Sequence, residues 1–315
     1  MSASTCHVSE DVWAELRLAP DRIHADCARI EREAHCWAVE HGVCAPQSEA
    51  TLLRAHFPRL AARIYHDAPV ERVVTVARWL IVLFALDDRF DRHDARPDDV
   101  RGLYRELADA LTRDRAAMRD PLTRAVEPLW QGTAAGMSEA WRDRFVRNLV
   151  RHGEALEWEA TLRRDAHAPT VAGYFDLRPW ANGMFMWDLV EPTRGQEVPV
   201  ELSVTYQWHC LTTCSNEITA WRNDLVSAAR EAIEGNPNNQ LSVMTHALGC
   251  DEAQANRFVE QHISGRVREL RAHARSLLAL DAGRTPRLAE ITGTMLSLTA
   301  AHARWVIESG RYPNP

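Results

Sequence analysis

Apolar residues recur along this chain every three or four positions, which is the spacing of an amphipathic α-helix. The segment before residue 87 shows the pattern clearly, because Leu80, Leu83 and Phe84 fall on one helical face. Segments that alternate apolar and polar residues between tight Asn-Gly or Asp-Gly turns, the usual sign of strands, are absent. The hydrophobic pattern therefore predicts an all-α protein.

Ten helices are expected, with short breaks between them that contain proline or glycine. The breaks are Ala68-Pro69, Arg96-Pro97, Glu191-Pro192, Gly235-Asn236-Pro237 and Asp281-Ala282-Gly283. The predicted helices span residues 20–41, 71–88, 97–111, 113–131, 139–164, 171–189, 201–233, 239–248, 252–279 and 285–308. Long helices with short connections indicate a bundle.

The length of 315 residues and a hydrophobic content of 46% are enough for a sizeable buried core. The sequence contains no internal repeat and no linker rich in Pro, Gly or Ser. We therefore expect one domain over residues 1–315, with residues 1–15 and 313–315 flexible.

The charge balance narrows the classes of function. A net charge of −7 gives no basic stripe, so we expect no nucleic-acid partner. Every cation is an arginine, because the chain has no lysine at all. Mechanisms that need a catalytic amine are excluded: a Schiff base, a pyridoxal phosphate site, or the lysine of a phosphate-binding loop.

The seven cysteines include no C-x-x-C pair. The N-terminal segment carries Glu10, Asp11 and Glu15 in place of the apolar run of a signal peptide. We expect free thiols in a reducing cytoplasm. The longest apolar run, residues 79–86, is far shorter than the about 20 residues that a membrane span needs. No membrane span is therefore predicted.

The first candidate site is the acidic string Asp87-Asp88-Arg89-Phe90-Asp91. Asp87 and Asp91 are four residues apart, so they share the helical face that carries the apolar stripe. Carboxylates on such a face are costly unless a cation meets them, and hard oxygen ligands suit Mg²⁺. The alternative is a solvated acidic helix end, which is supported by further aspartates at positions 94, 98 and 99.

The second candidate site consists of Asn223, Ser227 and Glu231, each four residues after the last. An amide oxygen, a hydroxyl and a carboxylate thus lie along one helical face. Taken alone, such a triple is more often an exposed helix surface. Two oxygen-rich clusters on long apolar helices could instead face each other across a bundle and hold metal and diphosphate between them.

These two strings, Asp-Asp-x-x-Asp and Asn-Asp-x-x-Ser-x-x-x-Glu, resemble the aspartate-rich and NSE motifs of bacterial-type class I terpene synthases. Two further landmarks are similar to that family. Arg178 lies 45 residues before Asn223, where the family has its diphosphate-sensing arginine. The chain end, Arg-Trp-Val-Ile-Glu-Ser-Gly-Arg-Tyr, resembles the family's C-terminal Arg-Tyr pair, here Arg311 and Tyr312.

The resemblance implies a single-domain terpenoid synthase α-bundle with a central active-site cavity. It also implies three Mg²⁺ ions, bound by Asp87, Asp88, Asp91, Asn223, Ser227 and Glu231. In this scheme Asp87 is the main ligand of the first motif. Asp88 and Asp91 support it or pair with arginines when the site closes.

The diphosphate of the substrate would then be held by arginines. Arg178 senses it, and Arg311 and Tyr312 close over it, so these three are the expected catalytic residues. Arg230 stands where relatives often carry a diphosphate-binding lysine, and an arginine keeps the charge in a forked form that suits phosphate.

One stretch departs from the family pattern. Relatives have a helix break with an effector residue shortly after the sensor arginine, whereas here Pro179 follows Arg178 directly. The family's linker and effector positions fall here on Ala181 and Asn182, so either the break is shifted by one residue to Gly183 or Asn182 takes the effector role. We expect the break itself at Asn182 and Gly183. The resemblance also implies an aromatic cavity wall, for which Phe84 and Trp305 are candidates, with ordinary core packing as the alternative for each.

The implied activity is that of a lyase: ionisation of a linear prenyl diphosphate, with farnesyl diphosphate favoured, followed by carbocation cyclisation to a terpene. Geranyl and geranylgeranyl diphosphate remain alternatives, and a homodimer is an open possibility. A prenyl-chain elongating synthase is disfavoured because the second motif is Asn-Asp rather than Asp-Asp and no lysine is present. The remaining rival is a non-catalytic helical protein.

Overall fold

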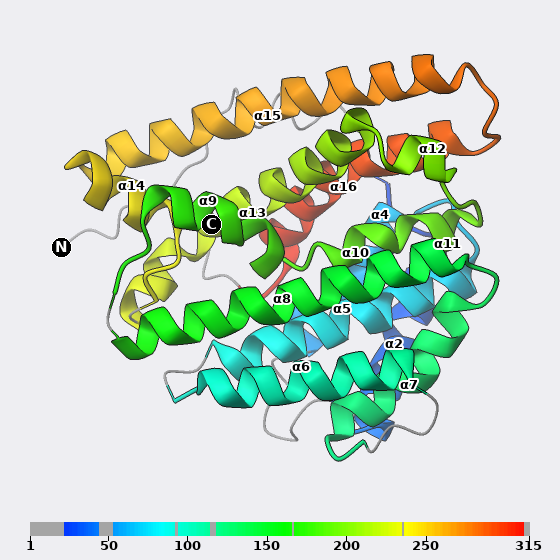
Figure 1. Ribbon diagram of the computed structural model, residues 1–315, viewed down its shortest axis with the longest axis horizontal. Helices are drawn as coiled ribbons and strands as arrows, with labels where there is room; N and C mark the ends of the chain where they lie inside the picture. Colours follow the sequence, from blue (N-terminus) through cyan, green and yellow to red (C-terminus); the bar gives the residue numbers. More distant parts are fainter. Residues whose placement is uncertain are drawn as a thin grey trace.

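The computed structural model describes residues 22–43, 53–91, 94–113, 118–165, 167–234 and 236–311. Throughout these ranges the regular structure is helical and there is no strand, as the sequence predicts (Figure 1). The helices are α2 (Cys27–Glu40), α4 (Phe57–Ile64), α5 (Val70–Phe90), α6 (Pro97–Thr112), α7 (Pro121–Ala134), α8 (Glu139–Asp165), α9 (Val171–Ala181), α10 (Phe185–Asp188), α11 (Val190–Arg194), α12 (Val200–Ser203), α13 (Tyr206–Glu234), α14 (Gln240–Leu248), α15 (Glu252–Asp281) and α16 (Leu288–Glu308).

Local sequence explains where many of these helices begin and end. Pro97 and Pro121 occupy the first turns of α6 and α7, where no backbone N–H is needed. Asp251 accepts a hydrogen bond from the backbone of Gln254, whose side chain bonds back, so α15 begins with a capping box. Gly249 ends α14 in the left-handed conformation, at φ 61°.

Most predicted helices are present, but several differ from the prediction. The helix predicted over 113–131 begins only at Pro121, and the one predicted over 171–189 ends at Ala181 and gives way to the short α10 and α11. The helix predicted over 201–233 is divided into the short α12 and the long α13. Helix α4, which was not predicted, packs against α5 and α16.

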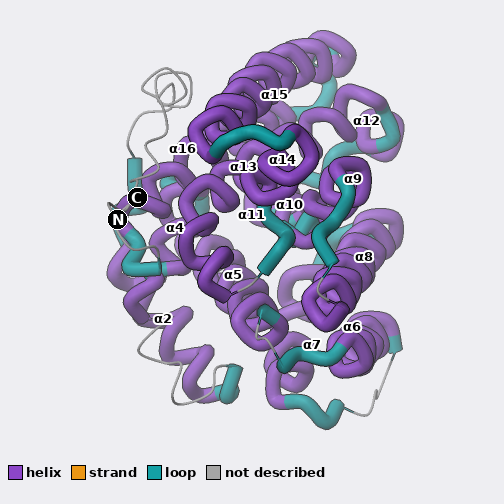
Figure 2. Tube along the Cα trace, turned by 90° about the vertical axis from the view of Figure 1, so that its left-hand side faces the viewer, coloured by secondary structure: helices purple, strands orange, loops and turns teal. Residues whose placement is uncertain are grey.

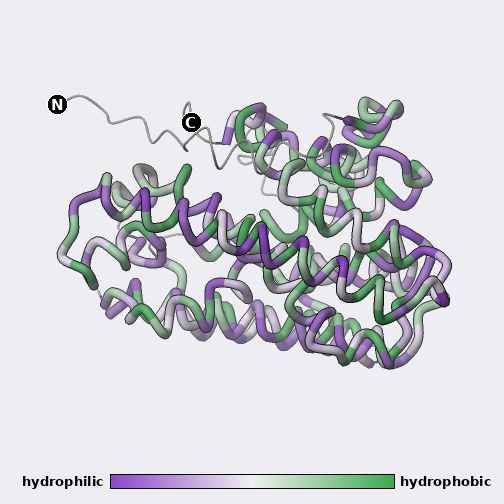
Figure 3. Tube along the Cα trace, turned by 90° about the horizontal axis from the view of Figure 1, so that it is seen from above, coloured by the Kyte–Doolittle hydropathy of each residue, from purple (hydrophilic) through white to green (hydrophobic). Residues whose placement is uncertain are grey.

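The long helices lie roughly along one direction. In Figure 1, α15 runs along the top and packs on α13, while α6 and α7 form the lower edge. Figure 2 shows the bundle end-on, with α4, α5 and α16 on one side and α8 and α9 on the other. Green and purple alternate along the helices in Figure 3, as the amphipathic pattern requires.

Close helix packing depends on one glycine in particular. A Cβ atom added to Gly153 on α8 would lie 2.3 Å from Cγ of Tyr104 on α6. No larger residue fits there without displacing the tyrosine ring. Gly153 therefore lets α6 and α8 approach, and α8 in turn carries buried charges to the centre of the molecule.

The part of the chain that the structure describes has no helix long and apolar enough to cross a membrane. Its cysteines, Cys27, Cys36, Cys210, Cys214 and Cys250, are free thiols. Cys6 and Cys44, like residues 1–15 and 313–315, lie outside the described residues.

Candidate active site

The acidic string lies at the C-terminal end of α5. Asp87 is half-buried, Asp88 is exposed, and Asp91 follows the last helical residue, its backbone N–H donating to the Asp87 carbonyl at 2.7 Å. Burial raises the pKa of Asp87 well above its usual range, and the neighbouring Asp91 carboxylate raises it further. This helix end thus concentrates negative potential that only a cation relieves.

Arg311 reaches this helix end from the far end of the chain. Its Nη2 donates to Oδ1 of Asp88 at 2.9 Å, and its guanidinium lies over the ring of Phe84, 5.0 Å from the centroid. The last helix ends at Glu308, as predicted, and Gly310 N–H is tied to the carbonyl of Arg54 at 3.0 Å. Tyr312 lies outside the described residues.

The second motif lies within the long helix α13. Ser227 Oγ donates to the carbonyl of Asn223 at 2.8 Å, and Asn239 Nδ2 donates to Oε2 of Glu231 at 2.9 Å. Burial raises the pKa of Glu231 to about 7, and the Asp224 carboxylate adds to the effect. The backbone of Arg230 belongs to the same helix, but its side chain lies outside the described part.

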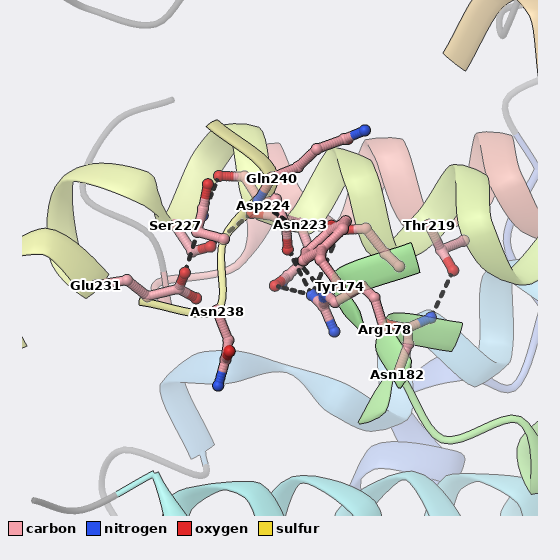
Figure 4. A network of polar contacts seen from close by, with 12 residues as sticks. Tyr174, Arg178, Asn182, Thr219, Asn223, Asp224, Ser227, Glu231, Asn238 and Gln240 are labelled. Atoms are coloured by element: carbon pink, nitrogen blue, oxygen red, sulfur yellow. Dashed lines mark hydrogen bonds and ion pairs between the residues drawn. The ribbon is translucent and has the colours of Figure 1, made fainter. Parts of the chain in front are cut away.

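Arg178 joins α9 to this motif through a buried carboxylate that was not among the predicted site residues. Its Nε and Nη2 donate to Oδ1 of Asp224 at 2.9 and 2.6 Å, and Nη2 also reaches Oδ1 of Asn223 at 3.3 Å. The other oxygen of Asp224 accepts from the hydroxyl of Tyr174 and from the backbone N–H of Gln240 at 2.8 Å. Figure 4 shows Arg178 and Tyr174 converging on Asp224, which is fully buried.

The break after Arg178 falls at Asn182 and Gly183. Asn182 caps α9 with its N–H bonded to the Arg178 carbonyl at 3.0 Å, and Gly183 follows at φ +76°. A Cβ on Gly183 would lie 2.7 Å from Cδ1 of Leu83, so the turn is seated directly on α5. The side chain of Asn182 donates to Oγ1 of Thr219 at 3.0 Å, as Figure 4 shows, and lines the cavity beneath.

A third helix, α8, brings two charged side chains that the motifs did not indicate. Arg163 lies 3.9 Å from Oδ1 of Asp91, and it donates to the carbonyl of Phe90. One turn earlier, Glu159 is buried, and burial raises its pKa to about 7 although Arg163 and Arg178 oppose the rise. The Glu-x-x-x-Arg spacing on this helix was the only sequence sign that they share a face.

An apolar cavity of about 70 Å³ lies below these polar groups. It is too small for a prenyl chain unless lining side chains move. Its walls come from α4, α5, α10, α13 and α16 and from the turn after α9. The lining residues are Leu60, Ile64, Tyr65, Val76, Leu80, Leu83, Phe84, Asn182, Met186, Trp187, Thr219, Leu298 and His302.

Phe84 belongs to the described lining of this cavity, and Trp305 does not. Trp305 is fully buried one layer behind, with its ring centroid 5.6 Å from those of Phe57 and Phe84. Its Nε1 donates to the carbonyl of Ala55 at 2.8 Å. From α16 the cavity instead receives His302, whose pKa burial lowers to about 3, so the imidazole is neutral.

The donor set suits a hard cation. Asp87 and Glu231 are carboxyl groups with raised pKa values on opposite sides of the site, so a bound cation would stabilise both in their ionised form. Among the described residues, no three His, Cys, Asp or Glu side chains gather closely enough to hold an ion by themselves. An ion here would need the amide and hydroxyl oxygens of Asn223 and Ser227, together with oxygens of a ligand.

Comparisons with known proteins agree with this chemistry. A family model described as terpene synthase family 2, C-terminal metal binding, matches residues 78–269. A curated (−)-delta-cadinene synthase from Streptomyces clavuligerus is 28% identical over 308 residues, which cover 94% of this chain and 93% of that protein. A (+)-eremophilene synthase from Sorangium cellulosum is 26% identical over 271 residues, 84% of this chain and 82% of that protein.

Two solved structures share the fold. A hedycaryol synthase in complex with HEPES aligns with a TM-score of 0.80 at 20% identity, covering 91% of this chain and 95% of that one. A linalool/nerolidol synthase from Streptomyces clavuligerus, in complex with 2-fluorogeranyl diphosphate, aligns with a TM-score of 0.81 at 20% identity, covering 90% and 99%. At this identity the likeness concerns the fold.

Proposed function

The chain belongs to terpene synthase family 2, and from this membership we propose that it ionises a linear prenyl diphosphate, farnesyl diphosphate in the first place, and cyclises the carbocation to a terpene. The observation that supports the proposal is that both arginines adjoin the lining of one apolar cavity: Arg311 lies over the lining residue Phe84, and Arg178 lies one turn before the lining residue Asn182 and bonds to the second motif. The names of relatives such as the delta-cadinene and eremophilene synthases support a fifteen-carbon substrate.

Mg²⁺ is the proposed cofactor, with three ions expected. The residues that would hold them are Asp87, Asp88, Asp91, Asn223, Ser227 and Glu231. When bound, the ions would neutralise the charge that develops on the departing diphosphate.

The arginines bind and orient the diphosphate in this proposal. Arg178 is fixed in direction because Asp224 and Asn223 hold its Nε and Nη2, whereas Nη1 takes no part in these bonds and is available to a phosphate oxygen. Arg311 approaches from the opposite side, over the ring of Phe84. Donors placed before the reaction stabilise developing charge without a reorganisation cost.

The cavity protects the carbocation. Its apolar lining, which includes the ring of Phe84, excludes water that would otherwise quench the cation. Asn182 and Gly183, at the break after α9, lie between Arg178 and the cavity. We assign them to the effector region, through which a change at Arg178 reaches the substrate chain.

The decisive experiment incubates the purified protein with geranyl, farnesyl and geranylgeranyl diphosphate, with Mg²⁺ and with EDTA. Diphosphate release and the products, identified by gas chromatography and mass spectrometry, are the readouts. We expect cyclic fifteen-carbon products from farnesyl diphosphate and no turnover in EDTA. Undiminished turnover in EDTA would refute the metal-dependent mechanism, and products from another substrate alone would correct the chain length.

A further inference from the structure

Asn238 lies in the short turn between α13 and α14, and its neighbours fix this turn firmly. The backbone N–H of Asn236 donates to the Glu231 carbonyl at 2.9 Å, and the Asn236 side chain accepts from the N–H of Asn238 at 3.1 Å. On the other side, the Asn239 amide bonds to Glu231 and to the Asp224 carbonyl, at 2.9 and 2.8 Å. The position of Asn238 is therefore set from both directions.

The side chain of Asn238 is buried without a hydrogen bond. Only 6% of the residue is exposed, and among the described residues neither Oδ1 nor Nδ2 has a partner. A buried amide without partners destabilises a fold, and an apolar side chain of similar size would avoid that cost. Such local violations are expected at functional sites, where the missing partner arrives as a ligand.

The direction of the amide indicates which ligand. Figure 4 shows Asn238 extending away from the network of dashed lines, on the side of α13 where Glu231 and Arg178 also point. Glu231 belongs to the second metal motif, and Arg178 is the arginine proposed above to bind the diphosphate. The Asn238 amide can donate a hydrogen bond without adding charge. Such a donor suits an anionic oxygen whose charge nearby cations already partly neutralise.

We propose that Asn238 is a further ligand of the substrate's diphosphate group, with Nδ2 donating a hydrogen bond to one of its oxygens. The inference rests on the proposed function. It adds a neutral residue from the α13–α14 turn to the arginines assigned above. The same contact would satisfy a buried amide that the protein alone leaves unpaired.

The test measures binding rather than turnover. Inorganic diphosphate is titrated into the full-length protein with excess Mg²⁺ by calorimetry, and thermal unfolding is followed without ligand. We expect Asn238→Leu to weaken diphosphate binding about ten- to a hundredfold, the range for a hydrogen bond to a charged group. The same variant should keep or raise Tm, by about 2–4 °C at most, because an unpaired buried amide is gone.

Two further variants separate the explanations. Asn238→Asp should bind diphosphate more weakly than Asn238→Leu, because it adds like charge and removes the donor. Thr123→Val on α7 is the matched control: its hydroxyl is also buried and unpaired among the described residues, so Tm should hold or rise while diphosphate affinity stays unchanged.

Three outcomes would overturn the proposal. If Asn238→Leu binds diphosphate as the wild type does, the amide makes no contact. If it lowers both Tm and affinity, the residue is structural. If Asn238→Asp binds as tightly as the wild type or more tightly, the oxygen serves a cation instead. A wild-type protein that does not bind Mg²⁺ and diphosphate at all would refute the proposed function itself.

Discussion

The α13 side and the α5 side of the active site differ in how firmly their side chains are held. On α13, Asp224 is fully buried and accepts from Arg178, Tyr174 and the Gln240 backbone. On α5, the matching ion pair joins Arg311 to Asp88, whose side chain is 44% exposed. Both arginines are buried, with side chains 11% exposed for Arg178 and 7% for Arg311, so the difference lies in the aspartates: only Asp224 is itself fully buried.

The difference separates two tasks that one site has to perform. A rigid, buried network gives a template whose donors need no rearrangement when charge develops. A half-exposed carboxylate such as Asp88 can exchange its partner at little cost, which suits a site that has to admit substrate and then cover it. We therefore interpret α13 with α9 as the fixed half of the site and α5 with Arg311 as its adaptable half.

Arg178→Ala is expected to have the largest effect, because it disrupts the hydrogen-bond network of the fixed half. The change leaves Asp224 buried without its cation, which should lower the free energy of unfolding by about 3–5 kcal/mol. Diphosphate release should fall by about a hundredfold or more. Urea unfolding and phosphate-release kinetics measure the two effects, with the exposed Arg164→Ala as control. Unchanged stability would contradict the template interpretation.

Arg311→Ala tests the adaptable half and should affect turnover more than stability. Loss of charge stabilisation worth about 2–4 kcal/mol would slow ionisation about a hundredfold. The free energy of unfolding should fall by less than for Arg178→Ala, by about 1–2 kcal/mol, because the partner Asp88 stays solvated and the loss is mainly the packing of the buried Arg311 stem on Phe57 and Phe84. A large loss of stability would show that this arginine is part of the fixed framework.

The pKa of Glu159 depends on charged groups in both halves of the site. Its shift predicts that the free energy of unfolding depends on pH. Burial raises the pKa of Glu159 to about 7 in the folded protein, above the ordinary value. The protonated carboxyl group therefore contributes stability that is fully present below about pH 4 and is lost as the pH rises through 7. In metal-free protein, Glu159→Gln should flatten this decline by up to about 3 kcal/mol. Unfolding curves at pH 5, 6 and 7 test it; parallel profiles for both proteins would refute it.

The smallest effect is expected for Asp88→Asn. It removes an ion pair with one largely exposed partner, so stability should change by about 1 kcal/mol or less and turnover only a few-fold. Steady-state kinetics against Mg²⁺ concentration provide the measurement. A loss as large as that of Arg178→Ala would mean that the adaptable half is as rigid as the fixed half.

The sequence predicts the fold well because amphipathic spacing and proline positions report on local structure. Helix α4 was missed because it is only eight residues long, carries a proline in its first turn and follows a left-handed His56. The start of α7 was predicted too early, at residue 113 instead of Pro121, because the helical spacing of apolar residues continues before this proline.

Site residues that repeat a motif could be named from the sequence, whereas those defined by packing could not. Asp224 was part of the quoted string, yet its role as the buried partner of Arg178 depends on α9 lying against α13. Glu159 and Asn238 carry no spacing signal that distinguishes them from surface residues. For Trp305 the sequence left cavity wall and core packing open, because helical position alone does not show that its indole bonds to the Ala55 carbonyl.

The side-chain amide of Asn239 links the proposed metal ligand Glu231 to the proposed diphosphate sensor Arg178. Asn239 holds the Glu231 carboxylate with the same nitrogen that binds the Asp224 carbonyl, and Asp224 in turn holds Arg178. In the proposed mechanism, a cation that draws Glu231 toward itself would compete with this amide, so metal binding and diphosphate binding would be coupled in one thermodynamic cycle. Reciprocity then requires that diphosphate change the affinity for the metal by the same factor by which the metal changes the affinity for diphosphate.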